Sequence, residues 1–376
     1  MTSAFRMNPD GLQRLLALLQ QMDYETIGPT MSGDAITYDR IASISDLPVG
    51  WTDEQAPGIY RLVRGDDREY FGYTLPAQSW KRFLYPPFRK LFSIKKNGRS
   101  LELDEAESGT AKYAFIGVRA CELSAISIQD KVFNLGEYRD DNYLSLRKKI
   151  FVVAVNCSHA GDNCFCTSMK TGPGAKHDFD IALTEILKEG DHYFIAEAGT
   201  EAGSAIIEMI GPGKATDDEI AAADNVVRET AAHITKSMDT RGLPELLADN
   251  LEHSQWEDVA KRCLTCGNCT MVCPTCFCST VEDATDLSGQ VAERSRRWDS
   301  CFTMDFAKVS GGNFRISPKS RYRQWLTHKL SSWVDQFGVS GCVGCGRCIA
   351  WCPVGIDLTA EVKAIRGTSV KQEKEV

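Results

Sequence analysis

Two short runs of cysteine constrain the fold of this chain more than any other feature of its sequence. The first run reads CLTCGNCTMVCP and contains Cys263, Cys266, Cys269 and Cys273. The second run reads CVGCGRCIAWCP and contains Cys342, Cys345, Cys348 and Cys352. Both follow the spacing C-x2-C-x2-C-x3-C-P, a bacterial iron–sulfur pattern in which the fourth cysteine ligates the other cluster of a pair.

The spacing suits a cube of iron and sulfur because of its reach. Two-residue gaps let one tight loop place three thiolates on three corners, and the glycines between the ligands, such as Gly267 and Gly344, ease that wrapping. The proline after the fourth cysteine prevents any preceding helix from continuing. We therefore predict two [4Fe–4S] clusters with exchanged fourth ligands. Cluster 1 takes Cys263, Cys266, Cys269 and Cys352, and cluster 2 takes Cys342, Cys345, Cys348 and Cys273.

Zinc and disulfides are the alternatives for so many thiols. Structural zinc usually takes two separated C-x2-C pairs, whereas this chain has two triplets, each with a trailing Cys-Pro. The N-terminal residues lack the apolar core and cleavage site of a signal peptide, so we expect a cytoplasmic chain whose 15 cysteines stay reduced. The longest apolar runs, such as 150–155, are too short to span a bilayer. A net charge of −8 argues against nucleic acid as a general partner.

The fold class expected from the sequence is α+β or α/β. Apolar strand-like runs at 112–118, 149–155 and 191–199 alternate with helix-like segments, which favours parallel pairing. We divide the chain into an N-terminal mixed α/β domain at 1–215, a helical linker at 216–252, a mainly α-helical ferredoxin-like dicluster domain at 253–366 and a disordered tail at 367–376.

Local signals add three expectations. Strand-like segments flank Asp66-Asp67 and also Asn97-Gly98, and the second pair of segments carries a strong hairpin signal. Ser317-Pro318 fits the start of a helix, and an apolar stripe continues from there to Gly338, which fits its end.

Seven cysteines lie outside the two runs. Cys121 and Cys157 each follow a strand-like run, and Cys164 and Cys166 share a loop with Cys157. If the two strands are parallel neighbours, all four thiols meet at the carboxyl edge of the sheet and form a third iron–sulfur site. The alternative is that they are small buried apolar side chains. Cys276, Cys278 and Cys301 either line the cluster cavity, which we favour, or extend the redox site.

The chain resembles the beta subunit of cytosolic NAD(P)-linked nickel–iron sulfhydrogenases, and it is similar in plan to the electron-input subunit of anaerobic sulfite reductase. Both cysteine runs carry this resemblance, together with GVRACELSAI at 117–126, NCSHAGDNCFC at 156–166, RRWDSCF at 296–302 and RYRQWLTHK at 321–329. The resemblance covers most of the chain. It implies a 4Fe-4S dicluster protein that carries electrons between a flavin subunit, where NAD(P)H reacts, and a catalytic or relay subunit.

The residues agree that the chain has no catalytic terminus of its own. No G-x-G-x-x-G follows a predicted strand, no P-loop is present, and the cysteines do not form the two separated pairs of a nickel–iron site. We therefore expect a non-catalytic electron-transfer subunit whose partners are the hydrogenase small and large subunits together with a flavin/NAD(P)-binding subunit. The alternative is the electron-input subunit of a sulfite or polysulfide reductase, whose partner would be the sulfite reductase catalytic subunit. A zinc-stabilised interaction module is a third possibility, from another class.

Overall fold

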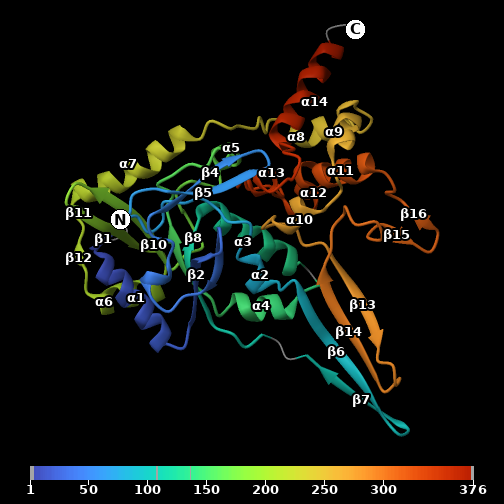
Figure 1. Cartoon of the computed structure of the whole chain (residues 1–376), viewed down its shortest axis with the longest axis horizontal. Coiled ribbons are helices and arrows are strands. Elements are labelled where there is room, and N and C mark those ends of the chain that lie inside the picture. The colour runs from blue at the N-terminus through green and yellow to red at the C-terminus, as the bar shows by residue number, and fades with distance from the viewer. Residues whose placement is uncertain (1–3, 107–108, 136, 374–376) are drawn as a thin grey trace.

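An eight-stranded mixed sheet forms the N-terminal part of the computed structural model, which describes residues 4–106, 109–135 and 137–373 (Figure 1). From one edge to the other, its strands are β12 (Gly213–Lys214), β1 (Ala4–Met7), β11 (Asp191–Ala198), β10 (Ile181–Lys188), β9 (Phe151–Val155), β8 (Tyr113–Val118), β2 (Glu25–Ser32) and β3 (Ala35–Arg40). The central pairs β10–β9, β9–β8 and β8–β2 are parallel, and the outer pairs are antiparallel. The predicted mixed α/β fold is confirmed.

Helices cover both faces of this sheet, which is why its central strands are apolar throughout. Helices α1 (Pro9–Gln21) and α6 (Glu201–Ile210) pack on one face, against alternate residues such as Ile116 and Val153. Helices α2 (Lys81–Leu84), α3 (Ala120–Phe133) and α4 (Asp141–Arg147) lie on the other face, against residues such as Phe115 and Val152. Helix α7 (Asp217–His233) packs on that second face over β10 and β11.

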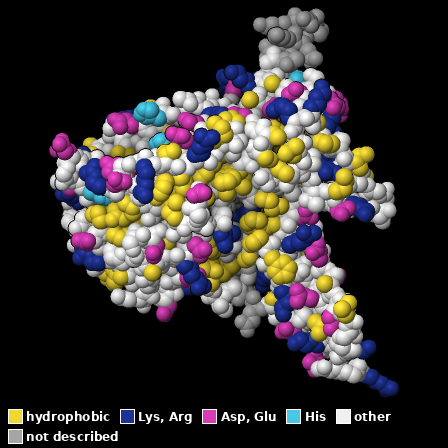
Figure 2. All heavy atoms as spheres, in the orientation of Figure 1, with side chains coloured by type: hydrophobic (Ala, Val, Ile, Leu, Met, Phe, Trp, Pro, Cys, Tyr) yellow, Lys and Arg dark blue, Asp and Glu magenta, His cyan; other side chains and the backbone are white. Residues whose placement is uncertain are grey.

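A second sheet of four strands joins the N-terminal part of the chain to the C-terminal part. Strands β6 (Phe88–Asn97) and β7 (Ser100–Glu105) form the hairpin predicted around Asn97-Gly98. Strand β14 (Val291–Trp298) pairs with β6 and with β13 (Ser279–Thr285). The four strands project from the body as an arm on which acidic and basic side chains are intermixed (Figures 1 and 2). The sequence pattern did not indicate β13 and β14 because they are polar and mostly exposed, so they carry no apolar face.

The strand-like segments around Asp66-Asp67 do not form a hairpin. Strand β5 (Ile59–Arg64) pairs instead with β4 (Trp51–Ala56), and Pro57-Gly58 makes the turn. The segment at 68–75 contains no strand. Gly58 has a φ of 76°, and this turn packs against the end of the second cysteine run, where the Gly58 amide donates to the carbonyl of Ile349 at 3.0 Å.

The C-terminal part contains helices around the cysteine runs, together with the hairpin β13–β14 and the small hairpin of β15 (Lys308–Val309) and β16 (Gly312–Asn313). These helices are α8 (Leu243–Asp249), α9 (Gln255–Arg262), α10 (Asn268–Met271), α11 (Pro318–Thr327), α12 (Trp333–Phe337), α13 (Arg347–Ala350) and α14 (Leu358–Glu373). Their core contains Trp256, Trp325 and Ile365. The predicted tail at 367–376 differs from the structure, because α14 continues to Glu373 and residues 374–376 lie outside the described part.

The helix expected between Ser317 and Gly338 is present but interrupted. Ser317 accepts a hydrogen bond from the Ser320 amide at its start, and Gly338 ends it with a φ of 70°. Between α11 and α12 the backbone forms a π-helical segment, His328–Ser332, which the apolar stripe did not reveal. None of the described helices is long and apolar enough to cross a membrane.

Candidate metal centres

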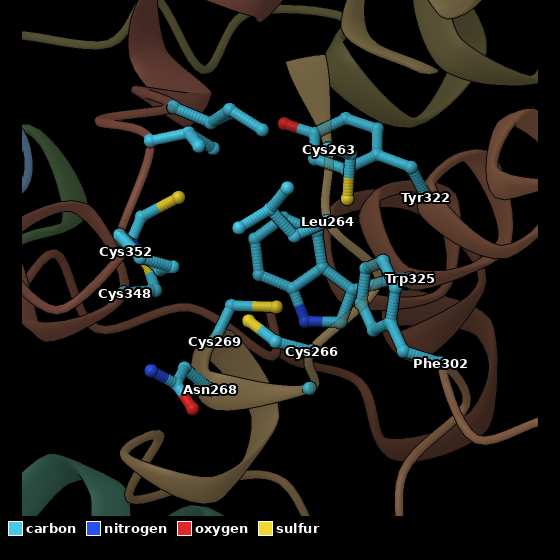
Figure 3. A pocket seen from close by; sticks show the side chains of 14 residues that line it. Cys263, Leu264, Cys266, Asn268, Cys269, Phe302, Tyr322, Trp325, Cys348 and Cys352 are labelled. Atoms are coloured by element: carbon cyan, nitrogen blue, oxygen red, sulfur yellow. The ribbon is translucent and has the colours of Figure 1, made fainter. Parts of the chain in front are cut away.

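The first cysteine run surrounds a cavity that also receives a cysteine from the second run (Figure 3). Helix α9 ends at Cys263, and Gly267, with a φ of 78°, turns the chain into α10. The sulfur-bearing residues that line the cavity are Cys263, Cys266, Cys269, Cys348 and Cys352. Phe302, Tyr322 and Trp325 supply an apolar wall. The structure therefore brings Cys352 to the three cysteines that we grouped with it.

The thiols of the two runs influence one another. Burial raises the pKa of Cys269, and the neighbouring Cys263, Cys352, Cys266 and Cys273 raise it further. Burial likewise raises the pKa of Cys348, and here the neighbours are Cys342, Cys345 and Cys273. Cys348 also lines the first cavity. The exchange of fourth ligands, which gives a first set of Cys263, Cys266, Cys269 and Cys352 and a second set of Cys342, Cys345, Cys348 and Cys273, stays a prediction.

Backbone amides point at ligand sulfurs in both runs. The Thr265 amide donates to Cys263 Sγ at 3.4 Å, and the Gly344 amide donates to Cys342 Sγ at 3.5 Å. Such hydrogen bonds stabilise thiolates. Where the thiolates ligate a cluster, the bonds raise its reduction potential. In the part of the chain that the structure describes, no three Cys, His, Asp or Glu side chains are arranged to hold a single metal ion.

A buried lysine faces the second set of cysteines. The ammonium of Lys329 lies 3.2 Å from Cys273 Sγ and 3.5 Å from Cys276 Sγ, and it donates to the Gly341 carbonyl at 3.1 Å. Burial lowers the pKa of Lys329, but the surrounding thiolates outweigh burial and raise it well above its usual value. Lys329 belongs to the π-helical segment, a backbone form that is frequent at functional sites.

Removing this charge should make the cluster that Cys273 would ligate harder to reduce. A unit charge about 5 Å away at an effective dielectric constant of about 20 contributes about 3 kcal/mol. We expect Lys329→Met to lower the reduction potential of that cluster by on the order of 100 mV. An EPR-monitored redox titration measures the shift. Lys319→Met is the matched control, because Lys319 lies on α11 but pairs with Glu257 at the surface. Equal shifts in both variants would contradict the assignment.

A second buried lysine holds the segment between Cys273 and Cys276. Lys81 Nζ donates to the carbonyls of both residues at 2.9 Å and lies 3.9 Å from the centre of a Trp298 ring. Lys81 comes from α2 of the N-terminal part, so this contact joins the first run to the mixed sheet. Sequence reasoning gave no role to Lys81 or Lys329, although Lys329 is the last residue of the stretch RYRQWLTHK.

Three further cysteines of the C-terminal part, Cys276, Cys278 and Cys301, lie beside the two runs. Cys276 is next to Cys273, and a hydrogen bond with its thiol and the charge of Lys329 hold the pKa of Cys273 well below its usual value, against the effect of burial. Cys278 and Cys301 are neighbours, and hydrogen bonding from Cys301 lowers the pKa of Cys278 to about 7. Cys276, Cys278 and Cys301 line a small cavity together with Lys329.

One buried ion pair joins the second run to the sheet. Arg347, which lies between Cys345 and Cys348, donates from Nη2 to Glu122 Oε1 at 2.5 Å, and both side chains are only 1% exposed. Glu122 directly follows Cys121 at the start of α3. Close backbone contact adds to this junction, because a Cβ at Gly344 would lie 2.7 Å from the Phe165 carbonyl. The second run is therefore built against the N-terminal domain.

Comparison with known proteins agrees with this architecture. The chain is 33% identical over 313 residues to sulfhydrogenase 2 subunit beta of Pyrococcus furiosus, which covers 82% of this chain and 88% of the relative. This chain belongs to the sulfhydrogenase beta-subunit family. Residues 262–356 match the 4Fe-4S dicluster domain family. No solved structure shows a significant match.

Membership in the sulfhydrogenase beta-subunit family confirms the resemblance that the motifs indicated. The chain is a 4Fe-4S electron-transfer protein of this family, with its dicluster domain in the C-terminal part. The dicluster match begins one residue before Cys263 and ends four residues after Cys352, so it contains both runs. The arm strand β6 and the N-terminal cysteines lie outside it.

Proposed function

We propose that this chain relays electrons between the nickel–iron hydrogenase module of a cytoplasmic complex and its flavin- and NAD(P)-binding subunit. Two [4Fe–4S] clusters with exchanged fourth ligands would carry the electrons. The observation that carries this proposal is the position of Cys352 in the cavity of the first run, with Cys273 among the cysteines of the second. Each run is incomplete alone, so folding holds the two sites next to each other.

The residues present fit such clusters. Four thiols of the first set line one cavity, an amide donates to a cysteine sulfur in each run, and aromatic side chains form a wall of the first cavity. When bound, the clusters supply one-electron transfer. The protein's contribution is to fix the ligands and to set the potential through hydrogen bonds, burial and charge. The Lys329 ammonium adds the strongest of these effects at the second set.

The first set lies where a partner can approach. Cys266 is exposed, and the apolar side chains of Leu264 and Val354 beside it are 61% and 39% exposed. All three line the cavity of the first run. An exposed apolar rim around a redox site is typical of a surface that another subunit covers. We therefore place the contact with one redox partner at this rim.

Partner identification tests the proposal. A tagged full-length chain is purified anaerobically from its native host, and the proteins that bind it are identified by mass spectrometry. We expect a flavin/NAD(P)-binding subunit together with hydrogenase small and large subunits. The isolated chain should take up electrons from dithionite but neither oxidise hydrogen nor reduce NAD(P). Recovery of a sulfite reductase catalytic subunit instead would overturn the hydrogenase assignment and favour the electron-input subunit of an anaerobic sulfite or polysulfide reductase.

A further inference from the structure

Four cysteines of the N-terminal domain lie around a separate cavity. Strands β8 and β9 are parallel neighbours, so the chain leaves both at the same edge of the sheet. Cys121 lies in the first turn of α3, after β8, and Cys157 lies two residues after β9. The loop that follows brings Cys164, and Cys166 starts the short helix α5 (Cys166–Met169). All four line one cavity.

A fifth thiol reaches the same cavity from the second run. Cys345 lines it together with Cys121, Cys157, Cys164 and Cys166. The set therefore includes all four N-terminal cysteines, and it borders on Cys345.

The four thiols converge on one shared cavity, as the cysteines of the first run do. Cysteines that serve only as small buried apolar side chains have no need to converge in this way. A cluster would fill this space, and it would need four thiolates, which the cavity provides.

A buried cation stands beside the thiols. Arg119, only 1% exposed, donates from Nη2 to the carbonyls of Phe71 and Tyr73 at 2.7 and 2.8 Å. These bonds fix the guanidinium in the cavity that Cys157 also lines. A fixed positive charge there offsets the negative charge of thiolate ligands.

We propose that Cys121, Cys157, Cys164 and Cys166 hold a third [4Fe–4S] cluster next to the cluster that Cys345 would ligate. The proposal rests on the electron-transfer function above and extends it. The Phe165 amide donates to the Gly344 carbonyl at 2.8 Å, and Thr171 Oγ1 donates to the Val343 carbonyl at 2.6 Å. These bonds fix the cysteine loop against the second run, so the third site adjoins the second set.

The third site extends the electron path to another face of the molecule. His159 lines the same cavity and is exposed, so the site reaches the surface beside this loop. At the opposite end of the series, Cys266 of the first set is exposed. The three sites therefore form a series that reaches the protein surface at both ends. Each end can contact one redox partner.

Iron content and spectroscopy of the full-length chain test the third site. In protein prepared anaerobically with its partners co-expressed, we expect about 12 irons per copy of this chain, after subtraction of the partners' iron, and Mössbauer spectra of [4Fe–4S] type. The double variant Cys157→Ala/Cys164→Ala should lose about four of these irons and retain the EPR signals of the other two clusters. Ser124→Ala is the matched control, because Ser124 lies on α3 close to Cys121 but does not line the cavity, and it should retain all of the iron.

The outcomes separate this proposal from the one on which it rests. About eight irons per chain in the unaltered protein would overturn the third site and leave the two-cluster relay standing. A single zinc ion that the double variant loses would also overturn it. A chain without iron would overturn both proposals. The iron count of the unaltered protein decides the question even if the double variant fails to fold.

Discussion

Replacing Glu122 with alanine is expected to lower the free energy of unfolding by about 3–5 kcal/mol, because it leaves the Arg347 charge buried and unpaired. The Glu122 carboxylate also accepts hydrogen bonds from the Tyr38 hydroxyl at 2.8 Å and from Trp80 Nε1 at 3.0 Å. In the variant, the guanidinium would keep the carbonyl acceptors of Pro76 and Gln78 and its contact with Cys345, but it would lose its carboxylate partner. Unfolding of the anaerobic protein in guanidinium chloride, monitored by tryptophan fluorescence, measures the decrease in the free energy of unfolding.

A surface ion pair serves as the control for this experiment. Arg294 and Asp283 face each other across the exposed arm at 2.7 Å, with side chains 44% and 66% exposed. Asp283→Ala should cost less than about 1 kcal/mol. Replacing both buried partners with apolar side chains, as in Glu122→Leu/Arg347→Met, should recover most of the stability lost in Glu122→Ala. Equal losses in Glu122→Ala and Asp283→Ala would show that the buried pair does not stabilise the junction.

Replacing Cys352 with alanine is expected to remove or convert one [4Fe–4S] cluster and to leave the other intact. The affected cluster should be the one assigned to Cys263, Cys266 and Cys269, because Cys352 lines their cavity although it belongs to the second run. The second set would keep all four thiolates. Spin quantification by EPR of the reduced protein, together with iron analysis, measures the number of intact clusters.

Double variants identify which cluster Cys352 serves. Under the exchange, Cys352→Ala/Cys263→Ala removes two ligands from one site, so the second cluster stays intact. Cys352→Ala/Cys342→Ala removes one ligand from each site, so both clusters are damaged. The reverse pattern would show that each run supplies all four ligands of its own cluster. Both double variants lack two thiols, so a general effect of cysteine loss is the same in each.

The cysteine runs were predictable because their information is local. Ligand spacing, the intervening glycines and the trailing prolines act within a dozen residues, so the sequence indicated the grouping of Cys352 with Cys263 before the structure showed both in one cavity. The strand-like runs before Cys121 and Cys157 were equally local, and their parallel pairing is confirmed. Whether those thiols bind metal stays a prediction.

Other features could not be deduced from local pattern. Strands β13 and β14 have no apolar face, and their partner β6 lies almost 200 residues earlier in the chain, so only the folded chain reveals the arm. Lys329 lies in an apolar helical stripe, where a lysine normally faces solvent. Its buried position beside Cys273 depends on the π-helical segment and on the approach of the second run.

The sequence by itself determined the chemistry of this protein, and the tertiary structure decided how its sites are connected. Cysteine spacing specifies iron–sulfur ligation because a short loop either reaches the corners of a cube or does not. Adjacency between sites has no such local rule. It arises because the Glu122–Arg347 pair and the 163–171 loop bring segments about 200 residues apart into contact, and so place Cys121 beside Cys345.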